Sequence, residues 1–281
     1  MSQARPPSDP PAPWGGLSVA PGETRAVRIG PRDLWAVHRD GEIWLGHTSS
    51  VTEGDPAGDA TSTPPDVPPE TLEWSRWATP GDEGELVLRP AFPDRAVVIE
   101  PERTFHLLPG TDARIYVRVP LSIRVELTPR NSQQGPVLLS ESPSVTLSDT
   151  WWGGTMEGEP AYWLPTSARR EIGPELFLPH LAICPLLLRN RSRSDLQVEK
   201  LAFRVVHLSL FTERGRLWGD ETIVVYEDQP EGSRVEMTGR PPQEAGDGAQ
   251  LVSGPRIRVE RGFRARTFDA LRAIPGVGGV W

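Results

Sequence analysis

The chain has 281 residues, enough for one large β domain or two smaller ones. Its net charge of -8 argues against a nucleic-acid-binding face, and the absence of a polybasic run or a long apolar segment argues against membrane insertion. The 31 prolines and 27 glycines disfavour long helices, so we expect short strands joined by loops.

The only cysteine is Cys184, which excludes an intramolecular disulfide and a cysteine-based zinc site. It lies in the apolar run HLAICPLLL, where we expect a buried and unreactive thiol. The first residues lack the apolar core of a signal peptide, so we expect a cytoplasmic protein.

The chain begins with a proline-rich, polar stretch, and we expect residues 1–20 to form a disordered tail. Short strands are predicted next, at 24–29, 34–39 and 42–47. The segment 48–70 contains almost no large apolar residue, so we expect a flexible insertion there.

The clearest pattern in the chain is ARIYVRVPLSIRVELT, residues 113–128. Apolar residues occupy every odd position from 115 to 127, while most even positions are polar. This alternation predicts one long strand with one buried face. Pro120 falls on the outer face and predicts a bulge or an unpaired edge position.

Further short strands separated by glycine and proline turns continue along the chain, and only 266–274 has helical periodicity. We therefore predict an all-β, antiparallel β-sandwich-like fold with little helix, built as two packed β subdomains that divide near Gly110. The first would span 21–110, the second 111–265. A short helix and flexible tail would follow at 266–281.

The stretch LSDTWWGGTMEGEPAYWL, residues 147–164, has the pattern of an aromatic hairpin. Alternation places Trp151 with the apolar residues before it and Trp152 on the opposite face, so we expect Trp151 to be buried and Trp152 to point outward. After the glycine pair the chain returns with Trp163 on the face opposite to Tyr162 and Leu164.

Two interpretations of this hairpin stay open. It is either a lid that packs its own aromatic side chains over the end of a sheet, or a binding platform in which Trp152 and Trp163 offer flat faces to a ligand or partner. On the second interpretation Asp149 would orient a polar group of the ligand. Its structural alternative is a turn in which the carboxylate accepts hydrogen bonds from nearby backbone N–H groups.

The motif LSDTWWG, followed by Gly158, Glu159 and Tyr162, resembles a family of archaeal and bacterial proteins known as domain of unknown function number 432. The runs 184–226 and 251–256 also resemble the second half of that family, so the resemblance covers roughly residues 95–265. The family has no established activity. The resemblance implies a channel-associated role, because genes of the family are expected beside those of small mechanosensitive channels.

The five histidines show no spacing typical of a metal pair, and the chain has no nucleophile elbow, phosphate-binding glycine loop or HExxH motif. We therefore expect no cofactor, no metal and no catalytic residue. Two enzymatic or ligand-binding alternatives remain: a carbohydrate-binding module or glycosidase that uses the aromatic hairpin, and a metal-dependent hydrolase built on the histidines.

Two further features suggest a partner. Arg169 and Arg170 follow the hairpin directly and could bind an anion or an acidic surface. The chain ends in Trp281, an apolar residue on a glycine-rich tail that we expect to dock into a groove. We thus predict a non-enzymatic β protein that binds a protein partner or ligand through the hairpin and the tail.

Overall fold

A computed structural model describes residues 13–39, 41–48, 67–79, 84–129, 135–228, 233–258 and 264–265. The tail and helix expected at 266–281, including Trp281, lie outside the described residues. So do most of the insertion expected at 48–70 and the first twelve residues.

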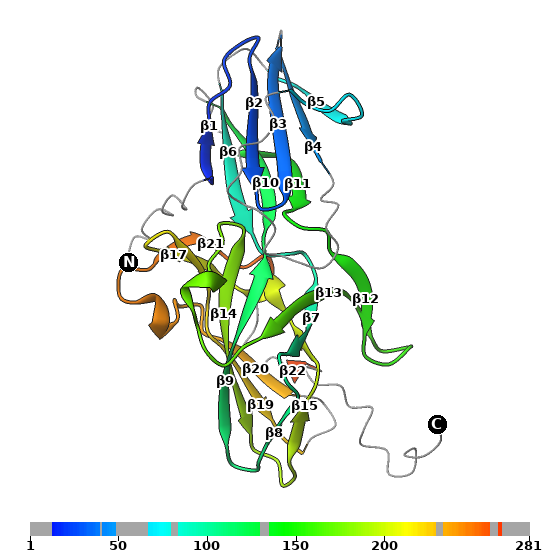
Figure 1. The fold of residues 1–281 in the computed structure, drawn as a ribbon, viewed down its shortest axis with the longest axis vertical. Coiled ribbons are helices and arrows are strands. Elements are labelled where there is room, and N and C mark those ends of the chain that lie inside the picture. Colours follow the sequence, from blue (N-terminus) through cyan, green and yellow to red (C-terminus); the bar gives the residue numbers. More distant parts are fainter. Residues whose placement is uncertain are drawn as a thin grey trace.

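Two four-stranded antiparallel sheets form the upper part of the molecule (Figure 1). The first has the order β2 (Thr24–Ile29), β3 (Arg32–Arg39), β4 (Glu42–His47) and β5 (Trp74–Ala78). The second has the order β1 (Gly15–Leu17), β6 (Gly84–Ala91), β10 (Ser122–Pro129) and β11 (Val137–Pro143). Buried Leu34 and Leu45 of the first sheet join Leu88 and Ile123 of the second in one core, which makes this part a β-sandwich.

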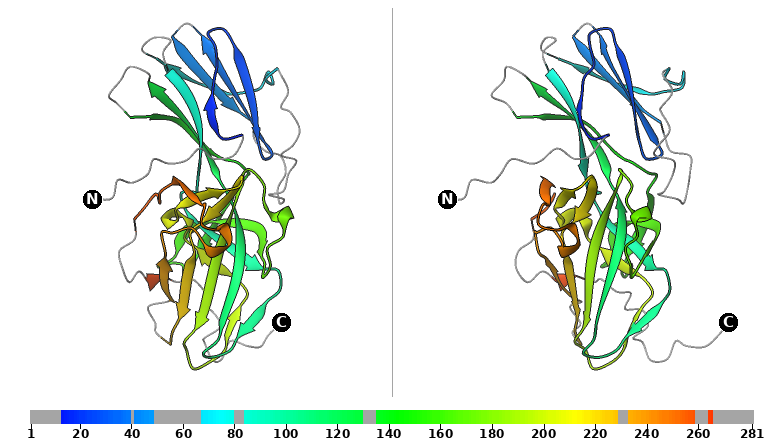
Figure 2. Two further views of the ribbon diagram at one scale, coloured as in Figure 1. Left: turned by 90° about the vertical axis from the view of Figure 1, so that its left-hand side faces the viewer. Right: turned by 60° about the vertical axis from the view of Figure 1, so that its left-hand side comes forward.

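An eight-stranded sheet dominates the lower part of the molecule (Figures 1 and 2). Two smaller sheets pack there, and their buried side chains join those of the large sheet in one core. The strands of the large sheet in order are β21 (Gln250–Ser253), β17 (Leu210–Glu213), β18 (Arg216–Gly219), β14 (Leu181–Asn190), β19 (Thr222–Tyr226), β20 (Ser233–Met237) and β22 (Arg264–Ala265), with β9 (Asp112–Pro120) on the other edge of β14. The smaller sheets are β12 (Ser148–Trp152), β13 (Glu159–Ala168), β7 (Ala96–Pro101) and β16 (Leu201–Phe203), and the pair β15 (Leu196–Val198) and β8 (Phe105–Leu107).

The described residues include only three helices, all short 3-10 turns: η1 (Pro174–Leu176), η2 (Val205–His207) and η3 (Gln243–Ala245). The all-β, sandwich-like prediction is therefore confirmed. None of the helices in the described part of the chain has the length and apolarity that crossing a bilayer requires.

The prediction of a disordered tail over 1–20 is wrong for its second half. Trp14 is buried, and its indole N–H donates a hydrogen bond to the carbonyl oxygen of Pro179 at 2.7 Å. Directly after it, β1 pairs with β6. A large buried aromatic side chain offsets the entropic cost of ordering a glycine-rich segment.

The expected division near Gly110 is also wrong, because the chain crosses between the two parts three times. It leaves the upper part after β6, returns for β10 and β11, and leaves again at β12. Pairing of β10 with β6 over eight residue pairs draws this later segment back into the first sandwich.

The alternating run 113–128 forms two strands instead of one. β9 ends at Pro120 in the large sheet, and β10 begins at Ser122 in the upper sandwich. The buried face continues across the break, since Val119, Leu121 and Ile123 are all at most 1% exposed. Pro120 marks this change of sheet and pairs with Leu181, so it is neither the bulge nor the unpaired edge position that we expected. The polar face carries half-buried arginines such as Arg114 and Arg124, each in an ion pair.

Pro185 lies in the middle of β14, a central strand, where a missing N–H would normally disrupt a ladder. One edge of β14 pairs with β18 at Ala182–Ile183 and then with β19 from Leu186, so Pro185 falls in the gap between these two partners. On the other edge of β14, Pro185 lies opposite Tyr116 of β9. The backbone N–H and C=O of Tyr116 both bond to Arg169, so Tyr116 needs no N–H from Pro185. The proline therefore removes no ladder bond.

The chain passes this gap at Asp220, which is fully buried between β18 and β19. Its two carboxylate oxygens accept hydrogen bonds from the backbone N–H groups of Ser209 and Gly239, both at 2.8 Å. Burial raises the pKa of Asp220 to about 6, although these backbone hydrogen bonds oppose the shift. Asp220 thus joins three segments at the cost of a buried charge at neutral pH.

Replacing Asp220 by Asn should flatten the dependence of stability on pH. The pKa of Asp220 is 3.8 in the unfolded chain and about 6 in the folded protein. The folded state therefore binds the proton more tightly, which stabilises the fold fully at pH below 3.8. This contribution is lost as the pH rises through about 6. A shift of this size corresponds to up to about 3 kcal/mol between pH 4 and pH 7. Urea denaturation at both pH values measures it, with exposed Asp247→Asn as the control. An unchanged pH difference in Asp220→Asn would contradict the assignment.

Candidate functional site

The predicted aromatic hairpin is present as β12 and β13 and projects sideways from the body of the molecule (Figure 1). Ser148 pairs with Trp163 and Trp152 pairs with Glu159, so the register is continuous over five residue pairs. β13 then pairs in parallel with β7, while β12 has no partner on its other side among the described strands. The hairpin is thus anchored along one strand only.

The two neighbouring tryptophans occupy opposite faces as predicted, but the prediction of which one is buried is wrong. Trp152 is 6% exposed and Trp151 is 52% exposed. Trp163 lies on the face of Trp152, whereas Tyr162 and Leu164 face the main core, as expected.

Small side chains explain the reversal. On the face of Trp152, the neighbouring strands present Ala161, Ala96 and Ala202, and these alanines form a separate buried cluster with the Trp152 indole and Val98. Small residues leave room for a large ring to lie flat over the sheet. On the opposite face, Tyr162 and Leu164 reach the main core, but Trp151 pairs with the exposed Pro160 and gains no buried neighbour there.

The tip of the hairpin is held in shape by hydrogen bonds to Gly154. Its carbonyl oxygen accepts from the N–H of Gly158 at 2.7 Å and from the indole N–H of Trp151 at 3.1 Å. A Cβ on Gly158 would lie 2.1 Å from the Trp151 ring nitrogen, so the glycine is needed for the ring to fold over the turn. Gly153 allows the chain to turn, with φ of 100°.

Trp151 and Met156 give this tip an apolar surface. Met156 is 93% exposed, the most exposed of the large apolar side chains in the described part of the chain. An exposed tryptophan and an exposed methionine on one hairpin are unusual for a solvated surface and are typical of protein contact sites.

Charged side chains border the hairpin. Asp149 forms an ion pair with Arg95 at 2.8 Å, in place of the turn that we expected as its structural alternative, and remains largely exposed. The Arg95 guanidinium lies over the ring of Tyr162, whose hydroxyl donates to Asp94. Burial, together with Asp94, raises the pKa of Tyr162.

The predicted platform of Trp152 and Trp163 is not open. Trp152 is buried, and the ammonium of Lys200 lies 5.1 Å from the centre of the Trp163 ring. Arg204, which is mostly buried, pairs with Glu159. The surface that the hairpin offers is therefore built around Trp151, not Trp152.

Arg169 and Arg170 lie at the opposite end of β13 from the hairpin tip and line a pocket of about 490 Å³. β7 and β13 run in parallel, so their carboxyl ends meet at one edge and the segments that follow form the two walls. Arg103 and Phe105 come from the first wall. No local pattern in the sequence points to these two residues, because only the pairing of distant strands brings them to Arg170.

Two of the histidines on which a metal-dependent hydrolase would depend, His38 and His47, lie on adjacent strands but do not pair with each other. His38 lies opposite Ile43 and His47 lies opposite Leu34. Within the described ranges, no three His, Cys, Asp or Glu side chains gather closely enough to hold a metal ion. Cys184 is fully buried, and burial raises the pKa of its thiol well above the usual value, as expected for an unreactive cysteine.

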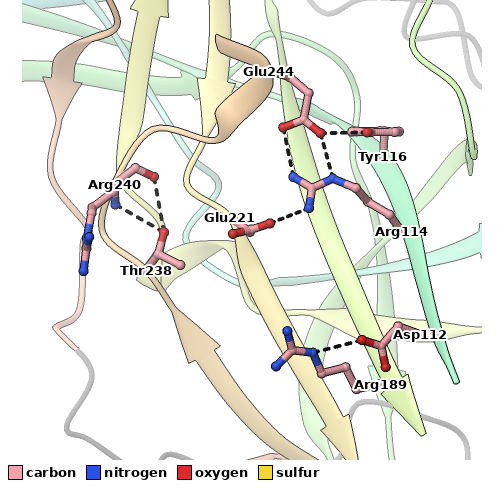
Figure 3. Close-up of polar contacts among 8 residues, drawn as sticks. All are labelled: Asp112, Arg114, Tyr116, Arg189, Glu221, Thr238, Arg240 and Glu244. Carbon is pink, nitrogen blue, oxygen red and sulfur yellow. Dashed lines mark hydrogen bonds and ion pairs between the residues drawn. The ribbon is translucent and has the colours of Figure 1, made fainter. Parts of the chain in front are cut away.

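A second polar cluster lies on the outer face of the large sheet (Figure 3). Arg114 donates two hydrogen bonds to the carboxylate of Glu244, at 2.7 and 2.9 Å, and a third to Glu221. The hydroxyl of Tyr116 donates to the same Glu244 at 2.7 Å. Burial acts to raise the pKa of Glu244, but the bonds from Arg114 and Tyr116 outweigh it and the pKa is lowered. The cluster satisfies itself and connects β9 to η3, which indicates a structural role.

Replacing Arg114 by Ala should destabilise the fold by about 1–2 kcal/mol, because Glu244 and Glu221 lose a charged donor while partial exposure limits the loss. Exposed Arg193, with no ion pair among the described residues, provides the control Arg193→Ala. Urea denaturation of both variants measures the difference. Equal stabilities for the two variants would show that the network contributes nothing.

Comparison with known proteins adds one finding. The model of a family described as "Protein of unknown function (DUF432)" matches residues 13–272. Neither the curated proteins nor the solved structures contain a significant match to the chain.

Proposed function

The chain belongs to the DUF432 family, a family of unknown function, and we propose from its own geometry that it is a non-enzymatic protein that binds a protein partner through the tip of the β12–β13 hairpin. The observation that carries this proposal is the exposure of both Trp151 and Met156 on a projecting hairpin. Tryptophan is one of the residue types that are enriched among the few residues that carry most of the binding energy of protein interfaces.

The tip has the composition of an interface centre with a polar border. Trp151 is held in place by its hydrogen bond to Gly154, so little side-chain entropy is lost when a partner covers it. Asp149 and Arg95 lie beside it and can exchange their mutual ion pair for contacts with the partner. The unpaired edge of β12 offers backbone groups for the same contact.

We place the protein in the cytoplasm, and the partner class to test first is a small mechanosensitive channel, which the resemblance to the family implies. The tail with Trp281 would contribute to the same association.

Site-directed photo-crosslinking in the cells that naturally contain the protein tests the proposal. A photoreactive residue in place of Met156, which leaves Trp151 intact, should give one defined product of higher mass, whereas the same residue at Leu251, an exposed apolar position on β21, should not. Equal, diffuse products from both positions would contradict a specific role for the hairpin tip.

A further inference from the structure

The pocket at the carboxyl ends of β7 and β13 is a second site, separate from the hairpin tip. Its floor is apolar: Ile115 and Ala168 are buried in the core, and Phe105 and Ile172 are partly buried beside them. A cavity of about 490 Å³ is within the size range of small-molecule sites.

The walls carry charges of both signs in equal number. Three arginines and three glutamates line the pocket: Arg103, Arg169 and Arg170, and Glu102, Glu171 and Glu175. Arg169 and Glu175 are 3.7 Å apart and partly neutralise each other. The other four charged residues form no ion pair within the described part of the chain.

Backbone hydrogen bonds hold both walls in place. Arg169 exchanges two bonds with Tyr116 of β9, at 2.7 and 3.0 Å, and the N–H of Glu102 donates to the carbonyl of Ala168 at 3.0 Å. The Arg170 guanidinium lies 5.9 Å from the centre of the Phe105 ring, which orients it toward the floor. The backbone at the start of each wall is therefore fixed, which helps to position the charged side chains that follow.

A balanced set of charges selects a particular ligand class. A simple anion would be attracted by Arg103 and Arg170 but repelled by Glu102 and Glu171, so it gains little net electrostatic energy. A ligand with one carboxylate and one ammonium group can satisfy both kinds of wall residue, while its apolar group covers the floor. Arginine binds a carboxylate with two parallel hydrogen bonds, which adds orientation to the attraction.

We propose that this pocket binds a small zwitterion with an apolar group, of the class of free apolar amino acids. The site is independent of the hairpin, and Trp151→Ala should leave its binding unchanged.

Titration calorimetry with three compounds that share one apolar body tests the proposal. L-phenylalanine carries both charges, N-acetyl-phenylalanine only the negative one, and phenylalanine methyl ester only the positive one. The full chain should bind L-phenylalanine at millimolar concentration or below, and each derivative should bind at least about tenfold more weakly, as expected for losing one charged contact.

Two exposed arginines provide the matching variants. Arg170→Ala and Arg103→Ala should each weaken L-phenylalanine binding about tenfold, whereas Arg193→Ala, outside the pocket, should not change it. No binding of L-phenylalanine at millimolar concentration would overturn the proposal. So would equal binding of N-acetyl-phenylalanine, which would show that a negative charge alone suffices.

Discussion

Replacing Trp152 by Ala should destabilise the fold by about 3–5 kcal/mol, the usual loss for a buried aromatic side chain. The indole is 6% exposed and packs on three alanines of its own sheet, so its removal takes away their apolar contacts and exposes them to water. Chemical denaturation followed by far-ultraviolet circular dichroism measures the loss without relying on tryptophan fluorescence.

The neighbouring residue is the natural control. Trp151→Ala should cost less than about 1 kcal/mol, because the ring is half exposed and contributes one hydrogen bond to the turn. Equal losses for Trp151→Ala and Trp152→Ala would mean that both rings are packed, and the exposed surface on which the proposed function depends would not exist.

Ile123→Ala should cost about 2–5 kcal/mol, the range for truncating a buried aliphatic side chain. Ile123 is 1% exposed and belongs to the core shared by the two sheets of the upper sandwich. The same measurement on Val137→Ala, in the adjacent strand β11 but 44% exposed, should show little change. A loss below about 1 kcal/mol for Ile123→Ala would show that this face is not core.

Local patterns predicted most of the strands but not their assembly. The alternation over 113–128 gave the buried residues correctly, since period two describes any extended chain with one buried face. It could not show that the strand changes sheet at Pro120, because this depends on partners far away in the sequence, β14 for the first half and β6 for the second.

The hairpin shows the same limit at the level of the site. Alternation placed Trp151 and Trp152 on opposite faces, which is a local property. The buried face was decided by Ala96 and Ala202, which reach the hairpin only through β7 and its neighbour β16. Alanines that lie side by side on neighbouring strands indicate space for a large ring, but their alignment is known only once the strand pairing is known. The pocket could not be predicted, because parallel pairing of β7 and β13 alone brings its walls together.

The affinity of the purified chain for the partner captured at position 156 tests the central claim most directly. Trp151→Ala should weaken binding about thirtyfold or more, as for a tryptophan at the centre of an interface, while Arg193→Ala leaves it unchanged. Unfolding measurements on the same samples confirm that both variants are folded. Affinity within about twofold of the unmodified chain for Trp151→Ala would contradict the role of the hairpin tip.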